Sequence, residues 1–546
     1  MARLALGLDS STQSLTAVAV DIDRRKTVYQ KSIDYLADPR LNQFGINRDY
    51  ILPPQEEGEA NQPVAMYFAS IDAIFSDLAA EFPDCGFDIK DIAVINTSGQ
   101  QHGHVLLSRP ALQEFSCLRE GELISGETLV SLLKKSPALP FARIWRTSST
   151  SEQADFLRDA LGGRGKIIEI TGSNAPLRFS AFGIMKTARE HPEQYSSTWR
   201  IHQISSLIPA VLAGDTDIPL DIGNACGTSL MNYREKEWSG PILKAISRFL
   251  QDAVSALEEK LPPLRTAKTL VGNLAGYFVQ KYGFNPECQI GIGSGDNPQT
   301  KVLAEGSLLS LGSSFVNMVE TDGRTFDMKG YANAMYDAFD RPFMFGCRTN
   351  GALRWDSVRA DFGLAKDDYQ PGERALRETP VGNRGRIFLW QAEKESFPAS
   401  GVFGPARFGY HEEDFNVDYA GIIESSLASV YLHSKHFTAP GDTLYLTGGP
   451  SESPEILRRV AALWNRTVIP VEKGGAALGA AVSGAYALLL AQGNRLDPGK
   501  YGSSFLSKKV PVEPRPDDVK AYHGPGGYLE KLGAVENSII SSQADR

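Results

Sequence analysis

Cysteine is scarce in this chain, and the placement of the few cysteines excludes two classes of stabilised protein. The 546 residues include five cysteines, and no two of them form a Cys-x-x-Cys pair. An odd number of scattered cysteines argues against a disulfide framework and against a structural zinc site. The pattern is typical of reduced thiols, so we expect a cytoplasmic protein.

The chain also lacks the marks of secretion, membrane insertion and general nucleic-acid binding. Its first residues hold no long apolar stretch and reach an acidic residue at Asp9, unlike a signal peptide. Residues 474–492 carry no charge and approach the length of a membrane span, but they are rich in alanine and glycine. We expect them to form a buried helix that packs closely on its neighbours. The net charge of −9 argues against nucleic acid as a general partner.

Several common catalytic motifs are missing as well. The chain has no GxxxxGK[ST] phosphate loop and no GxSxG nucleophile elbow. The glycine-rich segment 291–295 differs from the dinucleotide motif GxGxxG, because its third glycine comes one residue early. These absences disfavour a P-loop nucleotidase, a Ser-His-Asp hydrolase and a dinucleotide-dependent enzyme.

A sequence pattern near the start of the chain is repeated in its second half. Residues 4–20 and 307–319 each consist of an apolar run, a tight turn of glycine and hydroxyl residues, and another apolar run. This pattern predicts two β-hairpins. Such turns point backbone N–H groups and hydroxyls outward, where they can hold phosphate oxygens. One turn in each half therefore predicts two similar domains acting on one nucleotide, although two unrelated hairpins could share the string by chance.

Length and the alternation of elements predict an α/β protein with more than one domain. A chain of 546 residues is too long for a single core. Apolar spacing predicts strands over 92–97, from 290, over 443–447 and over 467–471, and helices over 63–82, 151–161, 241–260, 455–464 and 474–492, with a helical tail from 527. We expect domain limits at 1–305, 306–495 and 496–546.

Two acidic residues occupy turns where they could act on a phosphorylated ligand. Asp9 lies within the first hairpin turn, where a carboxylate would repel phosphate unless Mg²⁺ lay between them. Asp296 follows the glycine-rich strand end, and a carboxylate there could accept a proton from an attacking hydroxyl. An ordinary turn aspartate at Asp9 and a helix N-cap at Asp296 are the structural alternatives.

Two further loops follow predicted strands. The segment 448–453, Gly-Gly-Pro-Ser-Glu-Ser, precedes a helix and could hold a nucleotide base or ribose at the helix N-terminus. The segment 98–103, Ser-Gly-Gln-Gln-His-Gly, is rich in hydrogen-bonding side chains at a strand end, where α/β proteins usually place ligands. An ordinary strand–helix turn and a satisfied buried polar pair are the respective alternatives.

Together these turns resemble those of the FGGY carbohydrate kinases, within the actin/hexokinase/Hsp70 superfamily. Five segments occur in the family's order, and the likeness covers most of the chain: residues 8–14, 98–103, 295–298, 311–314 and 446–453. The resemblance implies two domains of ribonuclease H-like fold, with nucleotide and sugar in the interdomain cleft. It implies sugar binding and the catalytic base in 1–305, nucleotide binding in 306–495 and a C-terminal extension over 496–546.

The resemblance also implies a role for each matching residue. Asp296 would be the catalytic base, and Asp9 and Asp296 would place Mg²⁺. The sugar would be held by Gln101, His102, Arg178, Asp296 and Asn297. The ATP would be held by Ser11, Thr12, Gln13, Gly312, Ser313, Gly448, Gly449 and Ser453.

The chain departs from the family pattern at two carboxylates. Thr147 and Asn224 stand where the resemblance leads us to expect aspartate. The implied activity is ATP-dependent phosphorylation of a ketopentose, D-xylulose before others. A kinase for ribulose or glycerol, or a non-catalytic actin-like nucleotide-binding regulator, stays open. Sugar and ATP are the expected partners, and the oligomeric state is open, with a homodimer as one option.

Overall fold

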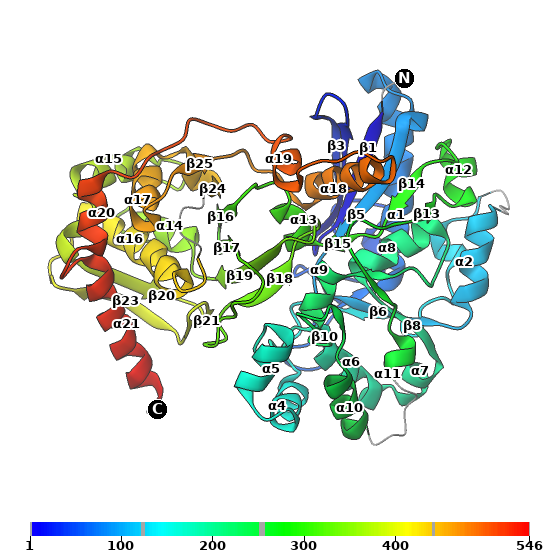
Figure 1. The fold of residues 1–546 in the computed structure, drawn as a ribbon, viewed down its shortest axis with the longest axis horizontal. Coiled ribbons are helices and arrows are strands. Elements are labelled where there is room, and N and C mark those ends of the chain that lie inside the picture. Colours follow the sequence, from blue (N-terminus) through cyan, green and yellow to red (C-terminus); the bar gives the residue numbers. More distant parts are fainter. Residues whose placement is uncertain (1–2, 122–125, 251–256, 439–442, 545–546) are drawn as a thin grey trace. The chain divides into compact units, whose positions relative to one another are not determined.

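The computed structural model describes residues 3–121, 126–250, 257–438 and 443–544 (Figure 1). Strands alternate with helices along the chain, so the predicted α/β class is confirmed. The chain divides into two units that each pack mainly within themselves. The first unit comprises Met1–Glu305, Ala334–Pro342 and Gly474–Phe505, and the second comprises Gly306–Asn333, Phe343–Lys473 and Leu506–Arg546.

A mixed sheet forms the centre of the first unit. Its strands run in the order β13-β14-β5-β1-β2-β3, and β15 also pairs with β5. The strands are β1 (Leu4–Ser10), β2 (Ser14–Asp21), β3 (Lys26–Asp34), β5 (Ile92–Gly99), β13 (Leu270–Asn273), β14 (Gln289–Gly291) and β15 (Ser294–Gly295). The first predicted hairpin is therefore confirmed: β1 and β2 pair antiparallel, from Leu4 opposite Asp21 to Ser10 opposite Leu15.

The two faces of β1 are covered by different helices. Side chains alternate along a strand, so Leu4, Leu6 and Leu8 share one face. These leucines join a hydrophobic cluster with residues of helix α1 (Val64–Glu81). The opposite face packs against helix α18 (Ala476–Ala491), which also contacts β2 and β5. The strand is therefore buried on both sides.

Small residues allow the backbone of α18 to contact the backbone of the sheet directly. A Cβ atom at Gly7 of β1 would lie 2.0 Å from the carbonyl oxygen of Ala477. A Cβ atom at Gly479 would lie 1.9 Å from the carbonyl oxygen of Gln299, in helix α13 (Asp296–Lys301). Glycine is required at both positions, and the expectation of a buried, closely packed helix over 474–492 is confirmed.

A buried chain of hydrogen bonds accompanies this contact. Nδ2 of Asn96 donates to Oγ of Ser483 at 2.9 Å, and that hydroxyl donates to Oε1 of Gln299 at 2.6 Å. Nε2 of Gln299 donates to the carbonyl oxygen of Thr97 at 2.9 Å. The chain links β5, α18 and α13, so the helix that begins with Asp296 is fixed from two sides.

The remainder of the first unit contains a second sheet and a group of helices, which share a second hydrophobic cluster. The second sheet has the order β4-β7-β6-β8, with β4 (Asn61–Pro63), β6 (His104–Ser108), β7 (Phe141–Arg143) and β8 (Thr198–Gln203). Short pairs join β9 (Leu220–Asp221) to β12 (Leu264–Arg265) and β10 (Met231–Asn232) to β11 (Glu237–Trp238), and β18 spans Asn333–Tyr336. The other helices are α2 (Ala111–Glu120), α3 (Leu129–Leu132), α4 (Ser151–Ala160), α5 (Arg164–Thr171), α6 (Ser180–Glu190), α7 (Pro192–Ser197), α8 (Ile204–Ala213), α9 (Ile222–Ala225), α10 (Gly240–Phe249), α11 (Leu257–Lys260), α12 (Gly276–Tyr282) and α19 (Pro498–Ser503).

The second unit contains the second predicted hairpin, which is also confirmed. Strands β16 and β17 pair antiparallel, with Leu311 opposite Phe315. The sheet continues in the order β19-β17-β16-β24-β25. Its strands are β16 (Ser307–Leu311), β17 (Phe315–Glu320), β19 (Pro342–Arg348), β24 (Leu444–Thr447) and β25 (Val468–Pro470), and short pairs join β20 (Ile387–Gln391) to β23 (Phe403–Phe408) and β21 (Glu395–Ser396) to β22 (Ala399–Ser400). The helices are α14 (Ala352–Asp361), α15 (Gln370–Glu378), α16 (Phe415–Ser434), α17 (Pro454–Trp464), α20 (Pro516–His523) and α21 (Tyr528–Ala544).

The predicted elements agree with these bounds in most places. The helix expected over 241–260 is present as α10 and α11, and its residues 251–256 lie outside the described part of the chain. The division into units differs from the expected limits at α18, because residues 474–505 pack within the first unit.

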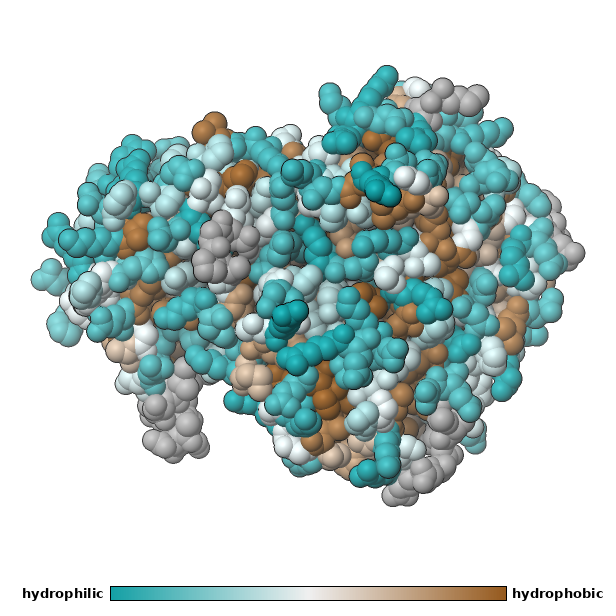
Figure 2. All heavy atoms as spheres, in the orientation of Figure 1, coloured by the Kyte–Doolittle hydropathy of each residue, from teal (hydrophilic) through white to brown (hydrophobic). Residues whose placement is uncertain are grey.

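Hydrophilic side chains cover most of the face in Figure 2. Within the described ranges, no helix combines the length and apolarity needed to cross a bilayer.

The contact at Gly479 generates a stability prediction. We expect Gly479→Ala to lower the free energy of unfolding by about 1–3 kcal/mol or more, because the methyl group must displace α13 or α18. Urea unfolding followed by circular dichroism measures the change. Gly165→Ala in α5 is the matched control, since no atom lies within 4 Å of its Cβ position. Equal unfolding midpoints for the two variants would contradict the close contact.

Candidate active site

Three strand ends meet at one edge of the first unit's sheet. Strand β5 pairs in parallel with both β1 and β15. Asp9 of β1 and Ser294 of β15 both lie opposite Ser98, and Gly295 lies opposite Gly99. The residues that follow β5 and β15 therefore leave the sheet beside Asp9, at the carboxyl ends where α/β folds place ligands.

The carboxyl groups of Asp9 and Asp296 interact at this edge. Oγ of Ser98 donates a hydrogen bond to Oδ1 of Asp9 at 2.7 Å. Burial raises the pKa of Asp9 to about 6, against the smaller effect of this hydrogen bond. Burial also raises the pKa of Asp296 to about 7, and the negative charge of Asp9 adds to the rise. Acidic groups with such shifts are typical of sites that bind cations or transfer protons.

Asn297 and Gln101 hold the Asp296 carboxylate in place. The backbone N–H of Asn297 donates to Oδ1 of Asp296 at 2.9 Å. Nδ2 of Asn297 donates to the same oxygen at 3.2 Å and to Oε1 of Gln101 at 3.0 Å. Nε2 of Gln101 is buried and has no hydrogen-bond partner among the described residues. An unpaired buried donor is costly, so this atom is suited to an acceptor on a ligand.

His102 presents a neutral ring whose orientation is fixed. Its Nδ1 lies 2.7 Å from the carbonyl oxygen of Gly227, which can only accept, so Nδ1 carries the hydrogen and Nε2 is left as an acceptor. The ring stacks on Phe179, with centroids 4.4 Å apart. Burial and the positive charge of Arg178 lower the pKa of His102 to about 3. The imidazole is therefore an uncharged acceptor at any physiological pH.

The first hairpin turn closes on itself through Ser11. The N–H groups of Gln13 and Ser14 donate to Oγ of Ser11 at 3.3 and 3.2 Å. The hydroxyl of Thr12 accepts from Nε1 of Trp145 at 2.8 Å and donates to Oε1 of Gln100 at 3.3 Å. The turn is therefore rigid, and its hydroxyl groups have defined directions.

Thr147 and Asn224, which stand where aspartate was expected, make different contacts. Oγ1 of Thr147 donates to the carbonyl oxygen of Ala60 at 3.0 Å and is buried. Asn224 donates through Nδ2 to Ser205, and its Oδ1 is buried without a partner among the described residues. Asp221 caps the same short helix α9, and burial raises its pKa to about 7. A buried carboxylate is therefore kept close to the position where one was expected.

In the second unit, the turn after β16 and the loop after β24 follow neighbouring parallel strands. Ser310 lies opposite Thr447, so Gly312 and Gly448 leave the sheet side by side. Gly448 has a φ of 106°, and a Cβ atom there would lie 2.1 Å from the carbonyl oxygen of Leu311. Only glycine fits this position.

The loop after β24 opens into a cavity of about 550 Å³ within the second unit. Gly449 and Ser453 line it, together with side chains from α14, α15, α16 and α17. Both residues are among those expected from the sequence to hold ATP. Sequence reasoning missed the aromatic and acidic lining, which includes Tyr369, Glu373 and Tyr419. These residues belong to no motif, and only the packing of the helices brings them together.

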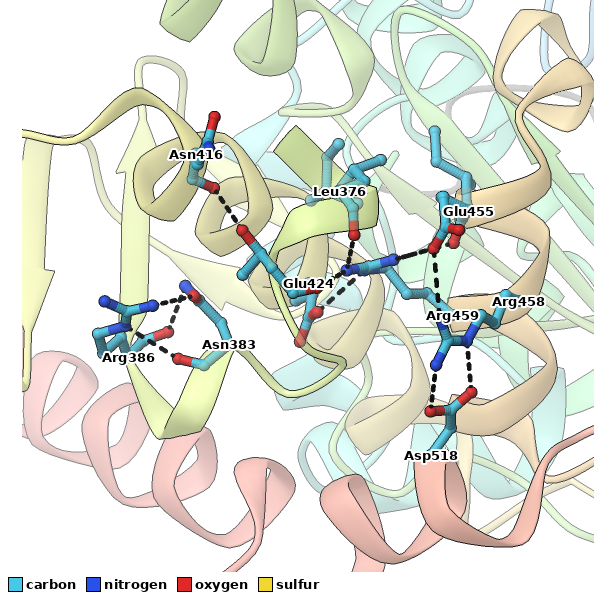
Figure 3. Close-up of polar contacts among 12 residues, drawn as sticks. Leu376, Asn383, Arg386, Asn416, Glu424, Glu455, Arg458, Arg459 and Asp518 are labelled. Carbon is cyan, nitrogen blue, oxygen red and sulfur yellow. Dashed lines mark hydrogen bonds and ion pairs between the residues drawn. The ribbon is translucent and has the colours of Figure 1, made fainter. Parts of the chain in front are cut away.

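A buried arginine holds the helices around this cavity (Figure 3). Nη2 of Arg459 in α17 donates to the carbonyl oxygens of Leu376 and Thr379, at the end of α15, at 2.8 and 2.9 Å. Nε donates to Oε1 of Glu424 in α16 at 3.0 Å. Neither charged side chain is exposed. Removing one partner of such a pair leaves an uncompensated buried charge, so the network fixes the three helices relative to one another.

The predicted site residues thus fall into two groups. Gln101, His102, Asp296 and Asn297 gather at the strand ends beside Asp9, and the guanidinium of Arg178 lies 5.8 Å from the ring of Phe179, on which His102 stacks. Ser11, Thr12 and Gln13 belong to the same unit. Gly312, Ser313, Gly448, Gly449 and Ser453 belong to the second unit. No motif indicated the contacts that Phe179 and Gly227 make with the imidazole of His102, which they position from distant segments.

Comparison with known proteins extends over the whole chain. Residues 124–302 match the FGGY family of carbohydrate kinases, N-terminal domain. The chain is 29% identical to D-xylulose kinase A of Aspergillus niger, covering 98% of this chain and 96% of that protein. It is 26% identical to the xylulose kinase of Mus musculus, covering 99% and 95%.

The fold is similar to that in the crystal structure of ligand-bound xylulose kinase from Lactobacillus acidophilus, with a TM-score of 0.78, 17% identity and coverage of 100% of this chain and 99% of that one. That protein and this chain share a fold at low identity, whereas the alignments with the fungal and mouse enzymes show relatedness along nearly the full sequence. Together with the domain match, they show that the chain is similar to the FGGY carbohydrate kinases over nearly its full length.

Proposed function

We propose that this protein transfers the γ-phosphoryl group of ATP to D-xylulose, forming D-xylulose 5-phosphate and ADP. Relatives that align over nearly the whole chain bear the name xylulose kinase. The observation that carries the proposal is the arrangement around Asp296, a buried carboxylate with a pKa near neutrality beside the unpaired Nε2 of Gln101.

The proposed sugar site offers both donors and acceptors, as a polyol requires. An alcohol group can donate one hydrogen bond and accept others. Nε2 of His102 would accept from a sugar hydroxyl, and Nε2 of Gln101 and the guanidinium of Arg178 would donate to sugar oxygens. Asn297 would complete the set next to the reacting hydroxyl.

In the proposed reaction, Asp296 is the general base. As the terminal hydroxyl of the ketose attacks phosphorus, its proton passes to the Asp296 carboxylate while the bond from phosphorus to the bridging oxygen of ADP breaks. General-base assistance is typically worth about 10²–10⁴ in rate, and the remainder of phosphoryl transfer depends on positioning and charge neutralisation.

The donor set at the strand ends fits Mg²⁺. This ion usually binds proteins through one or two carboxylates and takes its other ligands from substrate phosphates and water. Asp9 and Asp296 provide two carboxylates, and the parts of the chain that are described hold no larger His/Cys/Asp/Glu cluster. Asp9, oriented by Ser98, and Asp296 would hold the ion, which supplies charge neutralisation for the phosphates.

The two hairpin turns would hold the phosphates of ATP. The turns at residues 11–13 and at Gly312 and Ser313 are suited to phosphate oxygens, once the hydrogen bonds that several of their N–H and hydroxyl groups make within the protein are exchanged for the ligand. Gly448, Gly449 and Ser453 would lie along the nucleoside, at the cavity of about 550 Å³. The proposal requires both turns to face one nucleotide.

An acceptor panel tests the proposed substrate. We expect kcat/KM for D-xylulose to exceed that for D-ribulose and for glycerol by at least about tenfold, because misplaced or missing hydroxyls leave buried polar groups unpaired. ADP release measured with a coupling enzyme provides the values. A higher kcat/KM for either competitor would replace D-xylulose as the substrate.

Removing the proposed base tests the mechanism. We expect Asp296→Asn to lower kcat by about 10²–10⁴, because the amide cannot accept the proton, while ADP binding measured by calorimetry persists. The exposed Asp155→Asn, in α4 of the same unit, is the control and should keep wild-type kcat. An Asp296→Asn variant with near-normal turnover would refute the assignment.

The raised pKa values predict the pH dependence. The base must be ionised, so kcat/KM for MgATP should fall as pH drops through about 7, the pKa of Asp296 in the protein without bound Mg²⁺. Bound Mg²⁺ favours the charged carboxylate, so the corresponding fall in kcat should occur at lower pH. Initial rates between pH 5.5 and 8.5 measure both profiles. A flat kcat/KM profile across this range would contradict the assignment.

A further inference from the structure

We propose that Glu373 recognises the nucleoside of ATP by accepting a hydrogen bond from one of its N–H or O–H groups. This inference rests on the proposed function, since it assigns the cavity of the second unit to the nucleoside. It adds a specificity-determining residue that no sequence motif indicated.

Glu373 lies on α15 and lines the cavity of about 550 Å³. Its two carboxylate oxygens have different surroundings. Oε2 accepts a hydrogen bond from Oγ of Ser453 at 2.5 Å. Oε1 is buried and has no hydrogen-bond partner among the described residues. A buried acceptor without a partner carries a desolvation cost that a ligand donor can offset.

The bond to Ser453 fixes the direction of the free oxygen. Oγ of Ser453 also accepts from the backbone N–H of Ile456 at 3.1 Å, as the N-cap of α17. The single hydroxyl hydrogen of Ser453 is therefore directed at Glu373. A carboxylate held through one oxygen at a helix terminus presents the other oxygen at a set position.

The helix that carries Glu373 is itself fixed. The guanidinium of Arg459 donates to two carbonyl oxygens at the end of α15 and lies on the same helix that Ser453 caps (Figure 3). The acceptor and its supporting hydroxyl are therefore on two helices joined by a buried charge. Such an arrangement needs little reorganisation when a ligand binds.

The other acidic side chains of the cavity are already engaged by cations. Asp356 accepts from Nη2 of Arg359 at 3.0 Å, and Glu452 forms an ion pair with Lys509. The cavity also has aromatic and apolar lining, with Trp355, Tyr419 and Leu376. A flat base suits this lining, and the unpaired oxygen of Glu373 then meets a donor on the nucleoside, which is either the amino group of adenine or a ribose hydroxyl.

Binding of diphosphates to the full-length protein tests the inference without turnover. Calorimetry would compare ADP with IDP, which lacks the adenine amino group, and with 2′-deoxy-ADP and 3′-deoxy-ADP, for the wild type, Glu373→Ala and Glu373→Gln. We expect wild-type protein to bind one of the three analogues about 10- to 100-fold more weakly than ADP. In Glu373→Ala, ADP should weaken by that factor and the difference between ADP and that analogue should vanish. The identity of the analogue distinguishes the base amine from a ribose hydroxyl.

Glu378→Gln is the matched control, because this exposed glutamate lies on the same helix and should leave all four affinities unchanged. An equal loss for ADP and every analogue in both Glu373 variants would indicate a purely structural role and overturn the inference. Unchanged ADP affinity in Glu373→Ala, or wild-type protein that binds none of the four, would also overturn it. If nucleotide binding depends on Glu373 but the protein does not turn over D-xylulose, the proposed function is contradicted while the inference about Glu373 holds.

Discussion

The backbone contact between α18 and the central sheet is the constraint on which the first unit depends. Gly7 and Gly479 bring a strand and two helices so close that a single methyl group would clash with carbonyl oxygens. The chain of hydrogen bonds through Ser483 and Gln299 uses the same contact to fix α13. Since α13 begins with Asp296, a stripe of small residues near the end of the sequence determines where the proposed base lies.

Burial at the strand ends gives the candidate site its chemistry at a cost in stability. Asp9, Asp221 and Asp296 all have pKa values raised by desolvation. Gln101 and Asn224 each keep a buried polar atom without a partner in the described part of the chain. In a hydrophobic core, buried carboxyl groups and unpaired polar atoms would only destabilise the fold. At a ligand site, a bound cation or a ligand's hydrogen-bonding groups can compensate for them.

Local sequence predicted what depends on local chemistry. The hairpins, the closely packed helix over 474–492 and the glycine-rich strand end before Asp296 were all readable, because turn residues and small-residue spacing act within a few positions. Gly227, Phe179 and Glu373 were not, because their roles arise where segments distant in sequence meet. The same reason explains why α18 packs in the first unit, although chain order suggested otherwise. The roles of the individual site residues stay predictions.

The two missing carboxylates are compatible with the chemistry that remains. Threonine carries no charge, so Thr147 adds none to the site. Its hydroxyl donates a hydrogen bond to the carbonyl oxygen of Ala60. Asn224 follows Asp221 in the same helical turn, and its backbone N–H donates to that carboxylate at 3.1 Å. A second carboxylate at position 224 would place two like charges together in a buried region, where Asp221 is already hard to ionise. Asparagine avoids this repulsion and still offers an acceptor oxygen, so the substitution exchanges charge for hydrogen bonding while leaving Asp296 and its supports unchanged.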